Sequence, residues 1–419
     1  MSSGLYQKCM RFAWVWAGMM GSTWAWGSAC EEQVLQQLGW QLTQQASSDV
    51  TVTSVCQSAN VEDAQAQGLL RLNVNELQGP KRQALLQAAL YGQASRCAFQ
   101  FQVGKAVQTA THKISQNQGF GFTRVQTGWV SFRGGSQAQG WQATKSFGRR
   151  YQPLWPNSQA VEAFYTGHLR TECGTGRQMA QLGLLRELFG EDGFDRMFTP
   201  SELSIGTFVS LHSSDSILLG RHKGTLFADG SGSKTAALGQ QAWLGAPGMI
   251  EHVKDKSYLD DISNQAENFV VVAVSHEAQA HLQAASGFAQ MNADNVAIWQ
   301  MSQQITMVGE RYFERLLIEE DTRLWRVLPA KQYPIAKRMQ ALLAQAQYQQ
   351  FQVYVHPMGV KPVAYHVARL LDRNPRTPYK MALAMHNLPT EIYTRWLQWQ
   401  LQSCQTHNAA LPQTSGLKG

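Results

Sequence analysis

The chain has 419 residues, 44% of them hydrophobic and only 16% charged, and its formal net charge is +7. This length is enough for two or three domains, because domains average about 150 residues. The low charged fraction excludes a coiled coil and a chain kept disordered by its charge. No run of Lys and Arg with interleaved aromatic residues occurs in the sequence, so we expect no nucleic-acid partner.

Residues 1–29 have the pattern of a secretory signal peptide. Lys8 and Arg11 precede a mostly apolar run at 12–26, and small residues follow it. The run is shorter than the ~20 residues of a spanning helix, and an uncleaved anchor is the alternative. Cleavage would make Cys30 the first residue, and we expect membrane attachment only if Cys30 carries a lipid. The pattern predicts an exported protein, in the periplasm, on the cell surface or secreted.

Residues 30–115 are predicted to form an N-terminal region of Gln-rich helices with one strand. Alternation predicts the strand at 50–55, and apolar spacing predicts a helix at 82–91. Residues 120–150 combine glycines with aromatic residues, which is typical of short strands joined by turns. A short helix is predicted from Ser158 to Phe164, after several prolines.

Two apolar segments further along are predicted to be buried. The segment from Thr171 to Phe189 has the period of a helix that is covered on most sides, with Gly190 as its end. The continuous apolar run at 269–274 predicts a strand that is buried on both faces. Residues 300–406 are predicted to be mainly helical, as at 334–351 and 391–401, and the tail at 407–419 to be frayed.

The cysteines predict two disulfides and one free thiol. Cys9 lies in the signal segment, so five cysteines remain in the exported chain. Cys173 would be the free thiol, and in an oxidising compartment it is either reactive or an ordinary buried residue. The four cysteines expected to pair with each other are Cys30, Cys56, Cys97 and Cys404.

Cys173 is predicted at the N-terminus of the buried helix, directly after Glu172. The free N–H groups of a first helical turn favour the thiolate, which is the nucleophile. Gly174 and Gly176 leave room for a substrate, and backbone N–H groups there would receive an oxyanion. This arrangement is typical of papain-like enzymes, so Cys173 is the candidate nucleophile for acyl transfer.

A cysteine nucleophile needs a group that accepts its proton. Glu267 is one candidate, because it begins the buried strand, where a fixed backbone can aim a side chain into a cleft. Spacing alone leaves other candidates open: His168, His276, Glu277 and His281.

Three motifs resemble the spore-coat type protein-glutamine gamma-glutamyltransferase of bacteria, a transglutaminase on a compact papain-like fold. They are Glu172-Cys173-Gly174-Thr175 before a long helix, Phe189-Gly190-Glu191-Asp192, and Ala266-Glu267-Asn268-Phe269-Val270-Val271. The resemblance covers roughly residues 120–290. It implies Cys173 as nucleophile, Glu267 as its acidic partner and Glu172 as a supporting acid. His281 falls near the family's Ala-His-Gly motif.

The sequence also departs from the family pattern. Gly174 replaces an Ala, and no Trp precedes Ala266. A second alignment matches Trp243-Leu244-Gly245-Ala246 to the family's Trp-x-Gly-Glu motif, which would delete the catalytic acid. The apolar strand after Glu267 favours the first alignment.

The resulting prediction is an α+β fold in which a papain-like cysteine acyltransferase core at 116–299 carries the regions 30–115 and 300–406. The expected reaction joins protein Gln to protein Lys through a Cys173 thioester, so the expected partners are proteins with accessible Gln and Lys. We predict no cofactor and no metal, because His276 and His281 are five residues apart and lack a second ligand set.

Three alternatives stay open. The first is a glutamine deamidase or toxin, in which water takes the place of Lys. The second is a thiol peptidase or cell-wall amidase that pairs Cys173 with His276 or His281. The third is a secreted structural protein in which Cys173 is inert.

Overall fold

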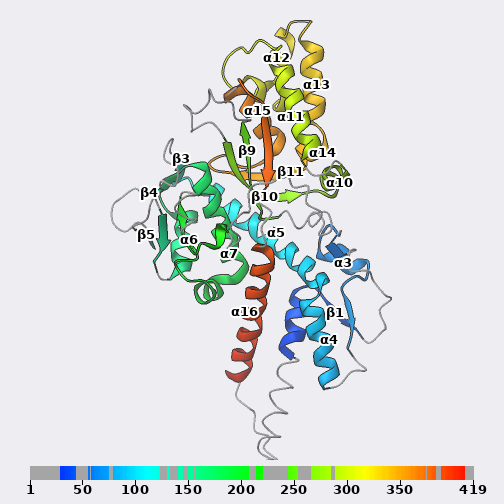
Figure 1. Ribbon diagram of the computed structural model, residues 1–419, viewed down its shortest axis with the longest axis vertical. Coiled ribbons are helices and arrows are strands. Elements are labelled where there is room, and N and C mark those ends of the chain that lie inside the picture. The colour runs from blue at the N-terminus through cyan, green and yellow to red at the C-terminus, as the bar shows by residue number, and fades with distance from the viewer. Residues whose placement is uncertain are drawn as a thin grey trace, which may run out of the picture. The chain divides into compact units, whose positions relative to one another are not determined.

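The computed structural model describes residues 29–43, 55–56, 58–74, 79–122, 130–132, 140–144, 150–154, 156–206, 214–219, 244–252, 266–284, 288–373, 375–383 and 388–410. The chain forms two compact units (Figure 1). The terminal unit comprises Met1–Phe99 and Thr390–Gly419, and the central unit comprises Gln100–Pro389. The predicted signal segment up to residue 28 and most of the predicted strand at 50–55 lie outside the described residues.

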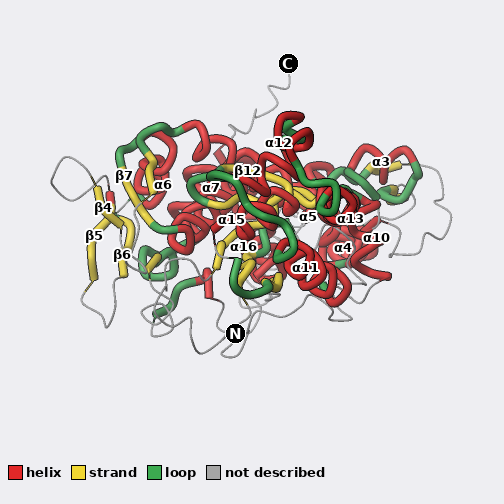
Figure 2. Tube along the Cα trace, turned by 90° about the horizontal axis from the view of Figure 1, so that it is seen from above, coloured by secondary structure: helices red, strands yellow, loops and turns green. Residues whose placement is uncertain are grey.

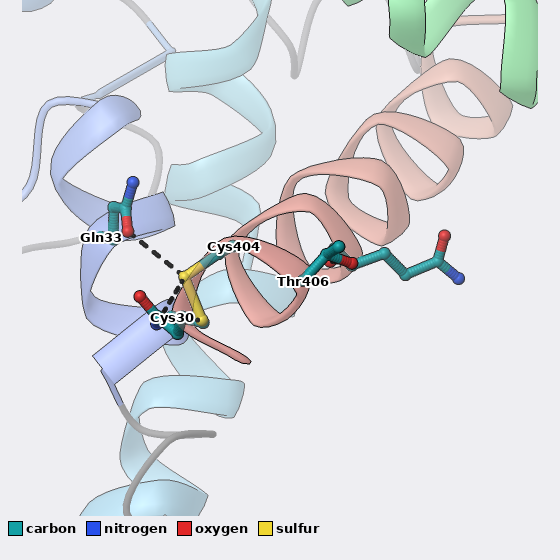
Figure 3. The surroundings of a disulfide bond; sticks show 6 residues. Cys30, Gln33, Cys404 and Thr406 are labelled. Carbon is teal, nitrogen blue, oxygen red and sulfur yellow. Dashed lines mark hydrogen bonds between the residues drawn. A yellow bond between two sulfur atoms is a disulfide. The ribbon is translucent and has the colours of Figure 1, made fainter. Parts of the chain in front are cut away.

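The terminal unit combines both ends of the chain. Cys30, in a helix over residues 29–37, is bonded to Cys404 in α16, 374 residues away (Figure 3). A second disulfide joins Cys56 to Cys97, so the four predicted cysteines form two disulfides, and Cys173 takes part in neither, as expected. The other elements include the parallel pair β1 (Gln41–Thr43) and β2 (Arg71–Asn73), with α3 (Val61–Ala66), α4 (Pro80–Tyr91) and α16 (Leu388–Ala410). Helix α5 (Gln93–Gln116) begins in this unit, and its residues from Gln100 onward belong to the central unit. The predicted helix at 82–91 is confirmed as part of α4.

The Cys30 disulfide bears on the lipid alternative. A sulfur atom in a disulfide has no valence left for a lipid thioether, so the bridge and the lipid exclude each other on this residue. Two disulfides are typical of proteins in oxidising compartments.

The central unit contains an antiparallel five-stranded sheet in the order β12-β11-β10-β9-β13. Three of its strands come from the region predicted to be helical, so the predicted boundary at residue 299 differs from the structure. The strands that were missed have only four or five residues each, and apolar runs that short do not distinguish a strand from a buried helix. The bounds are β9 (Pro247–His252), β10 (Ala266–Val274), β11 (Phe351–Val355), β12 (Gly359–Pro362) and β13 (Tyr379–Leu383).

Helix α7 (Cys173–Met197) packs against β10 and β11 of this sheet. It confirms the predicted buried helix, although Gly190 interrupts the helix at φ 68° and a further helical stretch follows. Helix α6 (Asn157–Thr166) packs against α7. The same part of the chain forms two three-stranded sheets and a 3-10 turn, η2 (Ile217–Leu219). One sheet consists of β3 (Phe120–Phe122), β4 (Val130–Phe132) and β7 (Leu169–Thr171), and the other of β5 (Trp141–Thr144), β6 (Arg150–Pro153) and β8 (Ile205–Gly206).

One face of the five-stranded sheet carries the main hydrophobic core. Figure 2 distinguishes the strands (yellow) from the helices (red) along the chain. Side chains alternate along a strand, so Phe269 and Val271 enter this core, and Cys173 packs against its edge. The predicted helix at 334–351 is wrong at its end, since helix α13 (Tyr333–Leu343) stops at Leu343 and Phe351 begins β11. The core is shared with α10 (His276–Ala284), α11 (Ala289–Ser302), the π-helical turn η6 (Glu314–Ile318), α12 (Thr322–Val327), α13 (Tyr333–Leu343), α14 (Ala346–Gln349) and α15 (Val363–Arg373).

Removing the long-range disulfide should destabilise the terminal unit. Cys404→Ser is expected to lower the free energy of unfolding by about 2–4 kcal/mol, because the bridge restricts a long loop of the unfolded chain. Urea unfolding of the oxidised protein, followed by circular dichroism, measures this change. Cys173→Ser breaks no bridge and serves as the control. Equal stability of the Cys404→Ser variant and the wild type would contradict the prediction.

Candidate active site

Glu172 caps α7 and directly precedes Cys173. Its backbone is extended (φ −83°, ψ 172°), which is the conformation of a residue that precedes a helix. Its carboxylate accepts hydrogen bonds from the backbone N–H of Gly174 and from that of Thr175 (2.6 Å), and also from the Thr175 hydroxyl (2.7 Å). The first-turn N–H groups expected to receive an oxyanion are therefore already bonded, and that expectation needs correction.

The Cys173 sulfur lies beside β10. The side-chain amide of Asn268 donates a hydrogen bond to Cys173 Sγ over 3.5 Å, and the thiol is half-buried. Burial raises the pKa of the thiol, and the charge of Glu172 raises it further, whereas Asn268 and the charge of Arg177 act in the opposite direction. The expected preference for the thiolate is thus not supported, because burial and the charge of the capping carboxylate both oppose the field of the N–H groups.

Glu267 is buried, with 3% of its side chain exposed, and its carboxylate is bound by α15. His366 Nδ1 lies 2.7 Å from Oε2, Arg369 bonds to Oε1, and Arg373 Nη1 lies 3.4 Å from Oε1. Because side chains alternate along a strand, Glu267 points to α15 while its neighbour Asn268 points to Cys173. The structure therefore brings Asn268, rather than Glu267, into hydrogen-bond contact with the sulfur.

Arg369 connects the two groups electrostatically. It forms an ion pair with Glu267, and negative charge on Cys173 acts to raise its pKa. Burial is the larger effect, and together with the charge of Arg373 it lowers the pKa of Arg369 to about 10. Glu267 can thus influence the sulfur through Arg369. Sequence reasoning missed His366, Arg369 and Arg373, although their spacing over two turns of α15 indicates one shared helix face.

His366 is a neutral, fully buried imidazole. Burial lowers its pKa to about 3, with a smaller contribution from the charge of Lys361. A neutral ring bonded to a carboxylate must carry its proton on Nδ1, so Nδ1–H donates to Glu267. Nε2 is buried and has no hydrogen-bond partner among the described residues.

His356 is the histidine that packs on the first turns of α7. A Cβ atom added at Gly176 would lie 2.4 Å from His356 Cβ, so only glycine fits there. The ring stacks on Phe120, Nε2 donates to the Gly121 carbonyl over 3.0 Å, and Nδ1 lies 3.4 Å from the Tyr354 hydroxyl. Burial lowers its pKa to about 4. With both nitrogens engaged, His356 connects α7 to β3 and to the end of β11.

The structure does not bring His281 to Cys173. Asn268 is near the start of β10, whereas α10 follows the other end of that strand, six residues or about 20 Å further on. His281 lines a separate cavity of about 380 Å³ with Asp294 and Gln345. His276 and Glu277 begin the same helix, and Glu277 accepts a hydrogen bond from Gln350. His168 lies beside Gly119, just before β7.

Neither a metal site nor a membrane span is found in the described ranges. No three His, Cys, Asp or Glu side chains there form a group that would hold a metal ion. Over the same residues, no helix combines the length and the apolar character needed to cross a membrane.

Removing the charge of Glu172 should activate the thiol. In Glu172→Gln the pKa of Cys173 falls, so more thiolate is present at neutral pH and alkylation by iodoacetamide speeds up, by roughly three- to tenfold for a shift of half to one pH unit. Rates measured against pH give the thiol pKa directly. Glu251→Gln, which alters an ion pair with Lys380, is the control. A pKa that is unchanged or higher in Glu172→Gln would contradict this account.

Glu267 should contribute to stability in addition to any role in chemistry. Glu267→Gln leaves two guanidinium groups without their shared anion, and we expect the free energy of unfolding to fall by about 3–5 kcal/mol. Urea unfolding at neutral pH measures the loss. The double variant Glu267→Gln with Arg369→Met should recover part of it, because it also removes one unpaired charge. A Glu267→Gln variant as stable as wild type would refute a structural role.

Comparison with known proteins gave no match: no family model, no curated protein and no solved structure matches this chain. The transglutaminase resemblance therefore rests on its sequence motifs alone.

Proposed function

We propose that the central unit is an exported cysteine acyltransferase that acts on carboxamides, with Cys173 Sγ as its nucleophile. One observation carries this proposal. Among the described residues, the thiol that takes part in neither disulfide is that of Cys173, which is the first residue of a buried helix, and an amide donor from β10 points at it. Inert buried cysteines are packed among apolar groups, whereas this sulfur has Asn268, Glu172 and Arg177 around it.

Asn268 is the donor that stabilises the oxyanion in this proposal. When the sulfur attacks a carboxamide, negative charge develops on the carbonyl oxygen close to the sulfur. The Asn268 amide donates to the sulfur and so lies next to that position, whereas the Gly174 and Thr175 N–H groups are engaged by Glu172. A fixed donor at the developing charge is a large part of catalysis by such sites.

Glu172 accepts the thiol proton. The resting thiol is protonated because its pKa is raised, so the proton must leave as the S–C bond forms. Glu172 is adjacent in sequence, and its charge acts on Cys173. The C–N bond then breaks, the proton passes to the leaving nitrogen, and ammonia and a thioester result. Glu267 acts as a positioning residue for Arg369, whose positive charge favours the anionic sulfur.

A Lys amine then attacks the thioester carbon, which restores the thiol and forms an isopeptide bond. The resemblance of Glu172-Cys173 and Glu267-Asn268 to the transglutaminase motifs supports this outcome over hydrolysis. A helix that starts at the cysteine and packs on an antiparallel sheet supports a papain-like core. The substrates are then proteins with accessible Gln and Lys, and the two disulfides together with the signal-peptide pattern support action outside the cytoplasm.

Ammonia release from a Gln-containing protein, with and without a fluorescent primary amine, tests the proposal on the full oxidised chain. We expect release and amine incorporation. Cys173→Ser should lower both by roughly a thousandfold or more, and Asn268→Ala by about a hundred- to a thousandfold.

His281→Ala is the matched control, and it should retain activity because His281 lines a different cavity. Activity retained in Cys173→Ser would overturn the proposal. Ammonia release without incorporation of the amine would instead assign deamidation. Loss of peptide cleavage in His281→Ala would favour the peptidase alternative.

A further inference from the structure

Exposed hydrophobic side chains gather in one part of the central unit, around α12 and the start of α13. Among the described residues five large hydrophobic side chains are exposed, and four of them lie at 307–308 and 327–333. Two hydrogen bonds join these segments: the Thr306 N–H donates to the Gln332 side chain over 3.3 Å, and that side chain donates to the Thr306 hydroxyl over 3.2 Å. We call residues 306–308 and 323–338 the tip. Its exposed hydrophobic residues are Met307, Val308, Val327 and Tyr333.

The tip is anchored to the core from beneath, so its outward side chains are held outward. Leu324 and Leu328 are buried in the main hydrophobic core, as are the inward-facing residues of α13. The Trp325 indole N–H donates to the Leu316 carbonyl over 3.0 Å, and the Tyr333 ring meets the Trp325 ring edge-on at 5.4 Å. Val327 is nevertheless 72% exposed. Gathered exposed hydrophobic side chains are typical of interaction sites.

The tip also carries unpaired positive charge. No Asp or Glu occurs in the sequence between Asp321 and Asp372. Lys337 lies over the Trp325 ring, with Nζ 4.2 Å from its centroid. No ion pair with an acid of the described residues is formed by the basic side chains of the tip, all of which are exposed: Arg323, Arg326, Lys331, Lys337 and Arg338.

Most acidic side chains that precede α12 are already paired. Arg311 binds both Glu314 and Glu319, and Arg315 binds Asp321 over 2.5 Å. These three carboxylates are therefore engaged by basic residues outside the tip.

The remaining acidic side chains do not balance the tip. Glu310 is exposed and lines a cavity of about 560 Å³ that α15 also lines. Asp294 of α11, the helix packed on α13, lines the second cavity with Gln345, which follows the opposite end of α13 from Tyr333. Glu320 is exposed. Even if Glu310 and Glu320 both reach the tip, two carboxylates face five basic side chains, so positive charge is in excess.

This combination matches an anionic bilayer better than other partners. Lys and Arg side chains are attracted to anionic headgroups, Trp and Tyr favour the headgroup level, and aliphatic side chains enter the acyl boundary. A symmetric contact with a second copy would place the basic side chains against their own equivalents. A nucleic acid would satisfy the charges but would leave Val308 and Val327 without an apolar partner.

We propose that the tip binds the surface of a bilayer that contains anionic phospholipid, with Val308, Val327 and Tyr333 at the acyl boundary and the basic side chains at the phosphates. Membrane attachment was expected only through a lipid on Cys30, whose sulfur is in a disulfide, and this contact needs no such lipid. The inference goes beyond the proposed acyl transfer and does not depend on reaction at Cys173.

Co-sedimentation of the full oxidised protein with vesicles tests the inference. Phosphatidylcholine vesicles with about a third phosphatidylglycerol should bind it about tenfold or more tightly than phosphatidylcholine alone at about 0.1 M salt. Amide hydrogen exchange should slow at residues 323–338 when the anionic vesicles are added. Equal binding to both kinds of vesicle, or protection that misses the tip, would overturn the inference.

Charge variants locate the contact. Arg326→Gln with Lys331→Gln should weaken binding to anionic vesicles by about tenfold or more, because each side chain near the surface contributes to the attraction. Lys81→Gln with Lys105→Gln removes the same charge from exposed positions outside the tip and is the matched control, with a change of about twofold at most. All variants share residues 1–28, so their differences report on the tip. Equal losses in the two pairs would overturn the inference.

Apolar variants distinguish a bilayer from a soluble polyanion. Val327→Asn with Tyr333→Ser should weaken vesicle binding by about tenfold and leave heparin binding unchanged. Tyr91→Ser, at the exposed hydrophobic residue outside the tip, should change neither. Unchanged vesicle binding in the tip variant would overturn the inference and assign the charges to a soluble acidic partner.

Two further results bear on the inference. A dimer in sedimentation velocity that Val327→Asn dissociates would assign the tip to a second copy and overturn it. Cys173→Ser should bind vesicles like the wild type, which separates this result from any failure of the acyl-transfer proposal.

Discussion

A buried carboxylate on β10 organises the central unit. Glu267 is 3% exposed, and such a group must be paired with cations or hydrogen-bond donors to remain charged. Three side chains of α15 supply these partners, so the helix is held in one register against the sheet. The same pairing positions Arg369 between the strand that reaches Cys173 and the cavity beyond α15.

The negative charge next to the Cys173 sulfur comes from the residue that caps α7. A carboxylate is a good helix cap, because it accepts the N–H groups that the first turn leaves without partners. Glu172 fulfils this requirement. Burial of the thiol and, as a smaller effect, the negative charge of Glu172 both raise the pKa of Cys173, which favours the protonated thiol at rest. In the proposed enzyme this protects the nucleophile in an oxidising compartment, since the thiolate is the form that oxidises. Activation then depends on the substrate and on the cationic side chains nearby.

The terminal unit and the central unit are each stabilised by a different kind of interaction. In the terminal unit the helix over residues 29–37 and α16 come from opposite ends of the chain, and a disulfide joins them (Figure 3). The aromatic contacts of Phe99 with Tyr393 and Trp396 also join distant segments. The central unit relies instead on one large hydrophobic core with a buried ionic cluster at its edge.

Local pattern was sufficient for the features whose signal lies within one segment. The start of α7 at Cys173, the buried strand containing Phe269, the helix that ends at Tyr91 and the two disulfides all follow from apolar period, capping or cysteine number. The α+β class follows from the same patterns. Only the tertiary structure decided that β11, β12 and β13 complete the sheet, that Asn268 rather than Glu267 meets the sulfur, and that His366, Arg369 and Arg373 surround Glu267. These are contacts between residues about a hundred positions apart, and sequence periodicity reports which face is buried but not which distant side chain covers it.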